Sequence, residues 1–306
     1  MSYPYLYRVL TMRTGIMVIG ILIIFIGLAG CTGYQASSSY SVDSKGTLSV
    51  SCAPVTTTEE VQFTNETYTK TKIVLHTRNG DVITYLASPV HPLAAIVYVP
   101  GAGEKPAGHE ERMVRYAGAG YAFLFVDIRG NGGQTPGYPF NPQRDFTLFE
   151  KSNWPQYYLT VCDLVAAQQV LSDRFSVPVY AMGSSNGGRY AAVAAGVDPE
   201  FSGYVGISTS DWGILDSAIE QGYSGNLIRF ATSLEPSTYF AKISPRPVWI
   251  FHTINDPVIP FESGKQFFRD AHEPKTFIEF SGEHGINTDV DDRILMQWAQ
   301  IYATRE

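Results

Sequence analysis

One stretch of the sequence, residues 177–197, constrains the fold more than any other. It reads VPVYAMGSSNGGRYAAVAAGV and divides into three parts. Residues 177–182 supply β-branched and large apolar side chains suited to a buried strand, and residues 190–195 contain no helix breaker before Gly196. The stretch therefore predicts a strand, a glycine-rich turn and a helix in direct succession.

The turn places a serine between two glycines. Residues 183–187 match G-x-S-x-G with Ser185 at the centre, a pattern in which a sharp strand-to-helix turn lifts the serine hydroxyl above the edge of a sheet. The flanking glycines accept unusual backbone angles and leave room for strand and helix to pack closely. Free N–H groups at the start of the helix would stabilise developing negative charge. Ser185 is the predicted nucleophile, and Ser184, which lacks a glycine two residues away on each side, is the weaker alternative.

Composition narrows the range of functions. With 306 residues, 44% of them hydrophobic, the chain can build a full core in one large or two ordinary domains. A net charge of −7 and the lack of any long run of Lys or Arg argue against nucleic-acid binding. The six histidines and three cysteines show no spacing typical of metal ligands, so we expect neither a metal ion nor a cofactor.

The first 30 residues are typical of an export signal. Two arginines precede an uncharged apolar run over 15–30, which is shorter than the roughly 20 residues that a membrane span needs. The run ends in Leu-Ala-Gly-Cys at 28–31, which resembles the lipobox of prokaryotic lipoproteins. This resemblance implies that the signal is removed before Cys31, that Cys31 carries lipid, and that the protein is held at the membrane outside the cytoplasm. An uncleaved N-terminal anchor is the alternative.

Residues 31–60 are rich in Ser and Thr and hold few large apolar side chains, so they predict a flexible tether. Cys52 lies near the end of this segment, and Cys162 lies in an apolar stretch with a helical pattern. An exported protein permits a disulfide between the two, but their spacing does not establish one. The folded domain is predicted to cover residues 61–306.

The domain begins with a hairpin and continues as alternating strands and helices. Residues 73–77 and 82–87 flank an Asn-Gly pair, which is a strong hairpin signal. The alternation that follows predicts an α/β fold in which helices cover both faces of a mostly parallel central sheet. The predicted strands cover 94–99, 121–126, 177–182, 204–208, 248–252 and 276–280, and the predicted helices cover 110–117, 157–175, 262–271 and 291–302.

Two long connections, 130–154 and 210–247, are rich in aromatic residues. Each follows a predicted strand, and ligands of open α/β sheets bind where the carboxyl ends of the strands lie. We therefore predict that these connections form the walls of a pocket, with 210–247 inserted as a small cap.

A serine nucleophile needs a base and a carboxylate that orients the base. Asp256 and His284 each lie in a loop after one of the last two predicted strands, so both are expected at the same edge of the sheet as Ser185. The order Ser, Asp, His and the three surrounding motifs resemble the α/β-hydrolase superfamily from about residue 73 to the C-terminus.

This resemblance implies that Ser185 is the nucleophile, that Asp256 in its D-x-V-x-P stretch is the acid, and that His284 is the base. It also implies that residues 127–132 form a structural turn that is frequent in this superfamily after a core strand. Weaker candidates remain for the acid and the base. They are His252, interpreted as a packed residue near the acid loop, and Glu283, Asp211 and Asp216 as alternative acids.

A tetrahedral intermediate needs two backbone N–H donors. Asn186, just after the nucleophile, supplies the first. The second is expected in the loop after strand 94–99, where this chain has Pro-Gly-Ala-Gly-Glu at 100–104. Many relatives carry a His-Gly pair or an H-G-G-G run at this place, so the chain departs from the commonest pattern. Ala102 is the predicted donor and Gly103 the alternative.

These features together predict an exported, membrane-tethered serine hydrolase that cleaves small-molecule or polymer esters of carboxylic acids through an acyl-enzyme on Ser185. The resemblance leaves two alternatives of the same fold, a peptidase and a lactonase. A non-catalytic binding module at the cell surface is the alternative outside enzymes.

Overall fold

The structure is a computed structural model that describes residues 38–303. The predicted export signal and Cys31 lie outside the described residues. Among the helices of the described chain, none has the length and hydropathy needed to cross a membrane.

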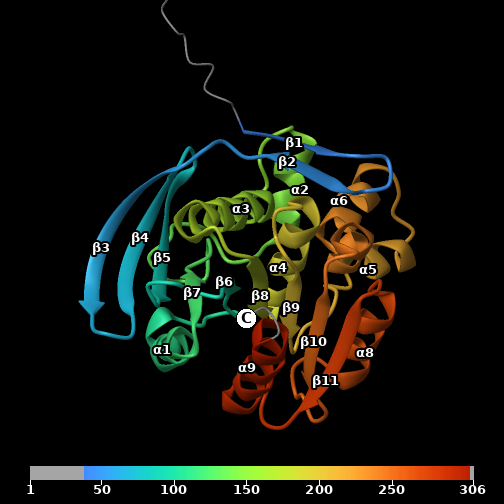
Figure 1. Cartoon of the computed structure of the whole chain (residues 1–306). Helices are drawn as coiled ribbons and strands as arrows, with labels where there is room; N and C mark the ends of the chain where they lie inside the picture. The colour runs from blue at the N-terminus through green and yellow to red at the C-terminus, as the bar shows by residue number, and fades with distance from the viewer. Residues whose placement is uncertain (1–37, 304–306) are drawn as a thin grey trace, which may run out of the picture. The chain divides into compact units, whose positions relative to one another are not determined.

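The core of the fold is a nine-stranded sheet in the order β11-β10-β9-β8-β6-β7-β5-β4-β3 (Figure 1). The six neighbouring strands β7, β6, β8, β9, β10 and β11 are parallel to one another. Strands β3, β4 and β5 continue the sheet beyond β7 as an antiparallel edge. The predicted mostly parallel sheet is confirmed, and the Asn-Gly hairpin joins β4 to β5. The strands are β3 (Thr56–Thr64), β4 (Thr69–Thr77), β5 (Gly80–Ser88), β6 (Ala94–Val99), β7 (Tyr121–Val126), β8 (Val179–Ser184), β9 (Tyr204–Ile207), β10 (Val248–Thr253) and β11 (Lys275–Phe280).

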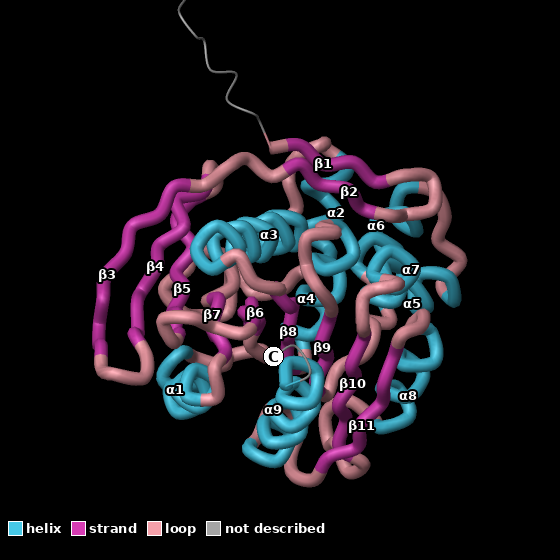
Figure 2. Tube along the Cα trace, viewed as in Figure 1, coloured by secondary structure: helices cyan, strands magenta, loops and turns pink. Residues whose placement is uncertain are grey.

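Helices cover both faces of the sheet because the central strands bury side chains on both sides. Every residue of β6, β7 and β8 is buried. Successive residues such as Val97 and Tyr98 belong to two different hydrophobic cores, since side chains alternate across a strand. One core contains residues of α3 (Gln156–Phe175), α4 (Asn186–Val197) and α8 (Phe261–Asp270), and the other contains residues of α1 (Glu110–Gly118) and α9 (Thr288–Ala303). Figure 2 shows these helices around the strands.

The two long connections fold into short helices. Residues 130–154 contain α2, and residues 210–247 contain α5, α6 and α7. The connections meet where Phe140 stacks on Trp212, with ring centroids 4.0 Å apart. The helices of the connections are α2 (Pro142–Glu150), α5 (Ile214–Glu220), α6 (Asn226–Leu234), the 3-10 helix η2 (Pro236–Tyr239) and α7 (Phe240–Ile243). Another 3-10 helix, η1 (Pro106–His109), lies directly before α1.

The predicted flexible tether is wrong for residues 38–60. Strands β1 (Ser39–Val42) and β2 (Leu48–Ser51) pair as an antiparallel hairpin, and β3 crosses the predicted domain boundary at residue 61. Val42 and Leu48 are buried in the core that contains α3 and α4, and the Leu48 N–H donates to the Tyr239 hydroxyl at 3.2 Å. A few buried side chains therefore hold a segment whose average composition is that of a linker.

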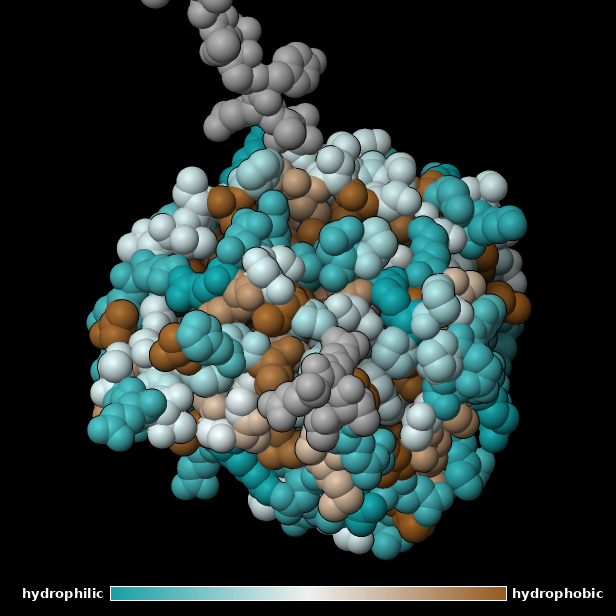
Figure 3. All heavy atoms as spheres, in the orientation of Figure 1, coloured by the Kyte–Doolittle hydropathy of each residue, from teal (hydrophilic) through white to brown (hydrophobic). Residues whose placement is uncertain are grey.

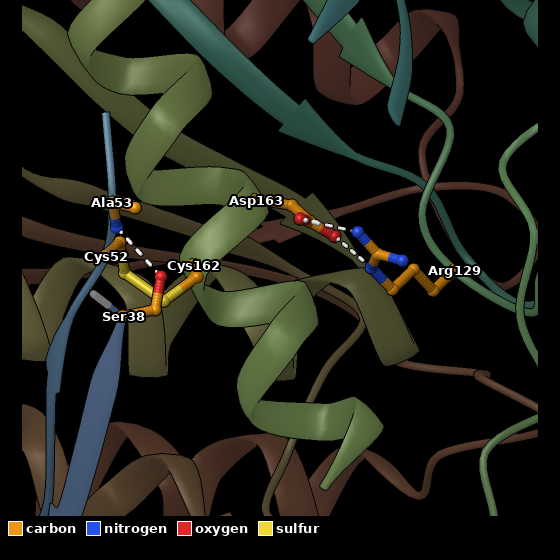
Figure 4. The surroundings of a disulfide bond; sticks show 6 residues. All are labelled: Ser38, Cys52, Ala53, Arg129, Cys162 and Asp163. Atoms are coloured by element: carbon orange, nitrogen blue, oxygen red, sulfur yellow. Dashed lines mark hydrogen bonds and ion pairs between the residues drawn. A yellow bond between two sulfur atoms is a disulfide. The ribbon is translucent and has the colours of Figure 1, made fainter. Parts of the chain in front are cut away.

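A disulfide ties this segment to the main domain. Cys52, just after β2, is bonded to Cys162 in α3, with the two Cα atoms 5.6 Å apart (Figure 4). The next residue of α3, Asp163, forms a buried ion pair with Arg129 at 2.7 Å. The sequence left this disulfide open, and the structure shows it. On the face shown in Figure 3, hydrophobic residues are scattered among hydrophilic ones, as is ordinary for a protein surface.

Replacing Cys52 and Cys162 together by alanine should lower the free energy of unfolding by about 2–5 kcal/mol, because the bond restricts the unfolded chain over a separation of 110 residues. Denaturant unfolding of the wild type and the variant, each with and without reductant, measures the effect. Reductant should bring the wild type to the midpoint of the variant and leave the variant unchanged. Equal midpoints for the oxidised wild type and the variant would contradict the expectation.

Candidate active site

Ser185 is the single residue between the end of β8 and the start of α4. Its φ of 52° and ψ of −122° define a conformation that residues other than glycine rarely adopt. Two contacts from the β9 side hold this strained residue. The Ser185 N–H donates to the Ile207 carbonyl at 2.8 Å, and the Thr209 hydroxyl donates to the Ser185 carbonyl at 2.9 Å.

Two glycines make this turn sterically possible. A Cβ on Gly183 would lie 2.3 Å from the Gly187 carbonyl oxygen, and a Cβ on Gly187 would lie 2.1 Å from the Val99 carbonyl oxygen. Both positions therefore exclude any side chain. The second contact also shows that the first turn of α4 packs directly against the end of β6.

The structure brings Ser185, His284 and Asp256 together in one hydrogen-bonded chain. His284 Nε2 lies 2.8 Å from Ser185 Oγ, and His284 Nδ1 lies 2.8 Å from each carboxylate oxygen of Asp256. The Asp256 side chain is fully buried, and that of His284 is 18% exposed. Asp256 Oδ1 also accepts the N–H groups of Val258 and Ile259 at 2.9 and 2.8 Å.

The electrostatics fix the roles of the two imidazole nitrogens. Burial would raise the pKa of Asp256, but hydrogen bonds from His284, Ile259 and Val258 outweigh it and hold the pKa below its ordinary value. Asp256 is therefore ionised at neutral pH and accepts the proton on His284 Nδ1. In the neutral ring, Nε2 is then an acceptor that faces the hydroxyl of Ser185. This arrangement can remove the serine proton as the oxygen attacks a carbonyl carbon.

Ser184 and His252 have supporting contacts rather than a place in this chain. Ser184 is completely buried, and its hydroxyl accepts the Ile286 N–H at 3.1 Å, two residues beyond His284. His252 is also buried, and burial lowers its pKa. Its Nε2 donates to the Ile259 carbonyl at 3.0 Å and lies 3.5 Å from Asp256, as expected of a packed residue near the acid loop.

The carboxylates of the three alternative acids form no hydrogen bond with the His284 ring in the described chain. Asp211 accepts the Ser237 N–H at 2.8 Å, and burial raises its pKa. Asp216 and Glu283 are exposed. None of the three is a hydrogen-bond partner of His284 in the described chain, whereas Asp256 is bound to it through both oxygens.

The loop after β6 lies where the strand order of the sheet reverses. The next strand of the chain, β7, pairs with one edge of β6, and β8 pairs with the other edge. Such a switch point is where ligands bind in open α/β sheets. In this loop the Gly101 N–H donates to Glu104 Oε2 at 2.8 Å, the Gly103 N–H to Asn131 Oδ1 at 2.7 Å, and the Glu104 N–H to the Gly101 carbonyl at 3.2 Å. Of the backbone N–H groups in residues 100–104, only that of Ala102 has no acceptor within the described chain.

This pattern favours Ala102 over Gly103 as the second donor. The first predicted donor, the Asn186 N–H, opens helix α4 and likewise has no acceptor among residues 38–303. The contact between Gly187 and Val99 brings the segments that carry the two N–H groups against each other. They are the two N–H groups that the sequence predicts as donors.

Asn131 has a role that the sequence did not reveal. It belongs to the predicted structural turn 127–132, and its side-chain amide donates to the carbonyls of Gly101 and Glu104 at 3.1 and 3.2 Å, while its oxygen accepts from Gly103. One side chain thus binds three backbone groups of the loop after β6. The resemblance of residues 127–132 to a recurrent turn was the only signal for this contact.

A cavity of about 720 Å³ opens beside the acid loop. Its wall includes Val258 next to Asp256, Trp212 from the aromatic connection, and Arg189. Arg189 lies over the Trp212 ring at 4.3 Å and donates to Asn186 Oδ1 at 2.8 Å. The cavity is therefore in contact, through Arg189, with the residue that follows Ser185.

No family model and no curated protein matches the sequence. Among solved structures, the chain is similar to an acetyl xylan esterase from Paenibacillus sp. R4, with 17% identity, a TM-score of 0.65, and 81% of this chain and 89% of that chain covered. It is also similar to acetyl xylan esterase 1 from Thermoanaerobacterium sp. JW/SL YS485, with 14% identity, a TM-score of 0.62, and 81% of this chain and 88% of that chain covered. The alpha/beta hydrolase GrgF from Penicillium sp. sh18 is similar with 16% identity and a TM-score of 0.52, and the match covers 82% of this chain and 98% of that chain. The chain has the α/β-hydrolase fold.

The α/β-hydrolase topology explains why residues far apart in the sequence meet. The parallel strands β6, β8, β10 and β11 all end at the same edge of the sheet. The loops at that edge carry Ala102, Ser185, Asp256 and His284, one after each of these strands. Ala102, Ser185 and Asp256 therefore each follow a fully buried strand, and His284 follows the edge strand β11.

Proposed function

We propose that the protein is a serine hydrolase that cleaves carboxylic esters through an acyl-enzyme on Ser185. The hydrogen-bonded chain from Asp256 through His284 to Ser185, at a strained turn beside two free N–H groups, carries this proposal. Two of the similar solved structures are esterases by their titles, which supports ester substrates for this chain as well.

The reaction follows from the roles of these atoms. His284 Nε2 takes the proton of Ser185 as Oγ attacks the carbonyl carbon, and the N–H groups of Ala102 and Asn186 stabilise the resulting oxyanion. His284 then gives the proton to the alcohol oxygen as the ester bond breaks, which leaves the acyl group on Ser185. Water attacks this acyl-enzyme with His284 again as base, and the acid and the free serine are released.

The substrate is a small-molecule or polymer ester, and the cavity next to Arg189 offers room for part of it. A peptidase and a lactonase use the same machinery on different bonds. A non-catalytic binding module is disfavoured because such a module has no need for a strained serine bonded to a buried histidine–carboxylate pair.

A panel of p-nitrophenyl esters of rising chain length, with matching anilides and lactones, tests the proposal. The wild type should hydrolyse esters in preference to anilides and lactones. Ser185→Ala should lose at least about 10³-fold in kcat because the nucleophile is gone, while Ser184→Ala should lose far less, since it removes only a support of the His284 loop. Ester turnover that survives in Ser185→Ala contradicts the proposal, and faster cleavage of anilides identifies a peptidase.

We also propose that the protein is exported and held at the membrane by lipid on Cys31, which lies outside the described residues. The apolar run before Cys31 and its lipobox-like end support this. A single acyl chain binds membranes only reversibly, so firm attachment requires at least two chains. In detergent phase partitioning, the wild type should enter the detergent phase and Cys31→Ala should remain in the aqueous phase or accumulate as precursor. A Cys31→Ala protein that partitions like the wild type would show that lipid at Cys31 is not the anchor.

A further inference from the structure

Glu104 folds back over the loop that carries Ala102. Its Oε2 accepts the Gly101 N–H at 2.8 Å, lies 3.3 Å from the Tyr98 hydroxyl and lies 3.2 Å from His109 Nε2. The Glu104 N–H also donates to the Gly101 carbonyl, so backbone and side chain close the same turn. A Cβ on Gly101 would lie 3.1 Å from Glu104 Oε1, so the carboxylate packs closely against this residue.

A network of polar side chains holds the carboxylate in this place. Arg112 Nη1 donates to His109 Nδ1 at 2.6 Å, and because arginine can only donate, the proton of the neutral His109 ring lies on Nε2 and faces Glu104. Arg112 Nε in turn binds both oxygens of Asp291 in α9 at 3.0 Å. His109 and Asp291 are both buried, so water has little access to these ends of the network.

Glu104 is charged in this setting. Burial would raise its pKa, but the hydrogen bonds from His109 and Gly101 and the charge of Arg112 outweigh it, and the pKa lies below its ordinary value. The network also reaches the loop of the predicted base, because Arg112 Nη2 donates to the Ile286 carbonyl at 3.3 Å.

The three residues before Glu104 give the loop little rigidity of its own. Gly101, Ala102 and Gly103 have no large side chain that packs, and glycine allows a wide range of backbone angles. Asn131 holds the loop from one side, and Glu104 holds it from the other. The Ala102 N–H lies between these two anchors, so the contacts of Asn131 and of Glu104 with the loop together set its direction.

We propose that Glu104 is a positioning residue for the oxyanion donor Ala102. The inference rests on the proposed function, since it needs an oxyanion for Ala102 to bind. Glu104 does not contact the reacting atoms, and its carboxylate acts by holding the Gly101 N–H, one residue before Ala102. Its loss should therefore weaken stabilisation of the transition state and leave binding of the substrate unchanged.

The experiment compares Glu104→Ala, Glu104→Gln and Glu111→Ala in steady-state ester hydrolysis, with thermal unfolding to confirm that each variant is folded. Glu104→Ala should lower kcat by about 10- to 100-fold with KM unchanged, less than the about 10²–10³-fold that loss of a whole donor costs. Glu104→Gln should recover most of kcat, because the amide oxygen can still accept the Gly101 N–H, which is the bond on which the proposal depends. Glu111 is an exposed glutamate of α1, and Glu111→Ala should behave like the wild type.

Ala102→Pro separates this inference from the proposed function, since proline has no N–H. Ala102→Pro should lose about 10²–10³-fold in kcat, and adding Glu104→Ala should cause no further loss. Wild-type kcat in Ala102→Pro overturns the donor assignment and this inference with it. If Ala102→Pro is impaired, three results would overturn this inference alone. The first is wild-type kcat in Glu104→Ala, and the second is a rise in the KM of Glu104→Ala without a fall in its kcat. The third is a Glu104→Gln variant that is as impaired as Glu104→Ala. If Glu104→Ala does not fold, Gly101→Ala, whose methyl would lie 3.1 Å from Glu104 Oε1 and crowd the carboxylate, is held to the same outcomes.

Discussion

The close approach of helix α4 to the end of β6 is the contact on which the site depends. A side chain at Gly187 would collide with the Val99 carbonyl, so the two segments touch through backbone alone. This contact fixes Ser185 in its strained conformation and places the loop after β6 beside it. A strained backbone conformation persists only when the structure around it holds it in place. For Ser185, the paired strands β6, β8 and β9 do so.

A hydrogen-bonded chain of hydroxyl, imidazole and carboxylate is not sufficient for such a site. Thr58 Oγ1 lies 2.6 Å from His76 Nε2, and His76 Nδ1 lies 2.9 Å from Asp81 Oδ1, on the antiparallel edge of the sheet. There His76 is 39% and Asp81 56% exposed, so water competes for the same hydrogen bonds. Thr58 also lies within a regular strand, without a helix N-terminus or a free N–H pair beside it. Burial and turn geometry distinguish Ser185.

The parts of the fold predicted from sequence are those with a strong local pattern. The strands 94–99 and 121–126 were predicted to the residue because each is a continuous apolar run, and the three motifs located Ser185, Asp256 and His284. The segment 38–60 was mispredicted because few of its side chains reach the core and because a disulfide to Cys162 has no local signal. Val42 and Leu48 are buried there, and Tyr40, Val50 and Val55 pack against it. The contacts of Asn131 and Glu104 with the loop after β6 join residues through tertiary structure, so no spacing in the sequence reveals them.

Covalent labelling tests the central claim most directly. The protein is treated with a fluorophosphonate, which reacts with an activated serine, and the modified residue is located by mass spectrometry of its peptides. The account predicts one adduct, on Ser185, that forms far more slowly when His284 is replaced by alanine. An adduct on Ser184 or elsewhere, or labelling of Ser185 at the same rate without His284, would contradict it.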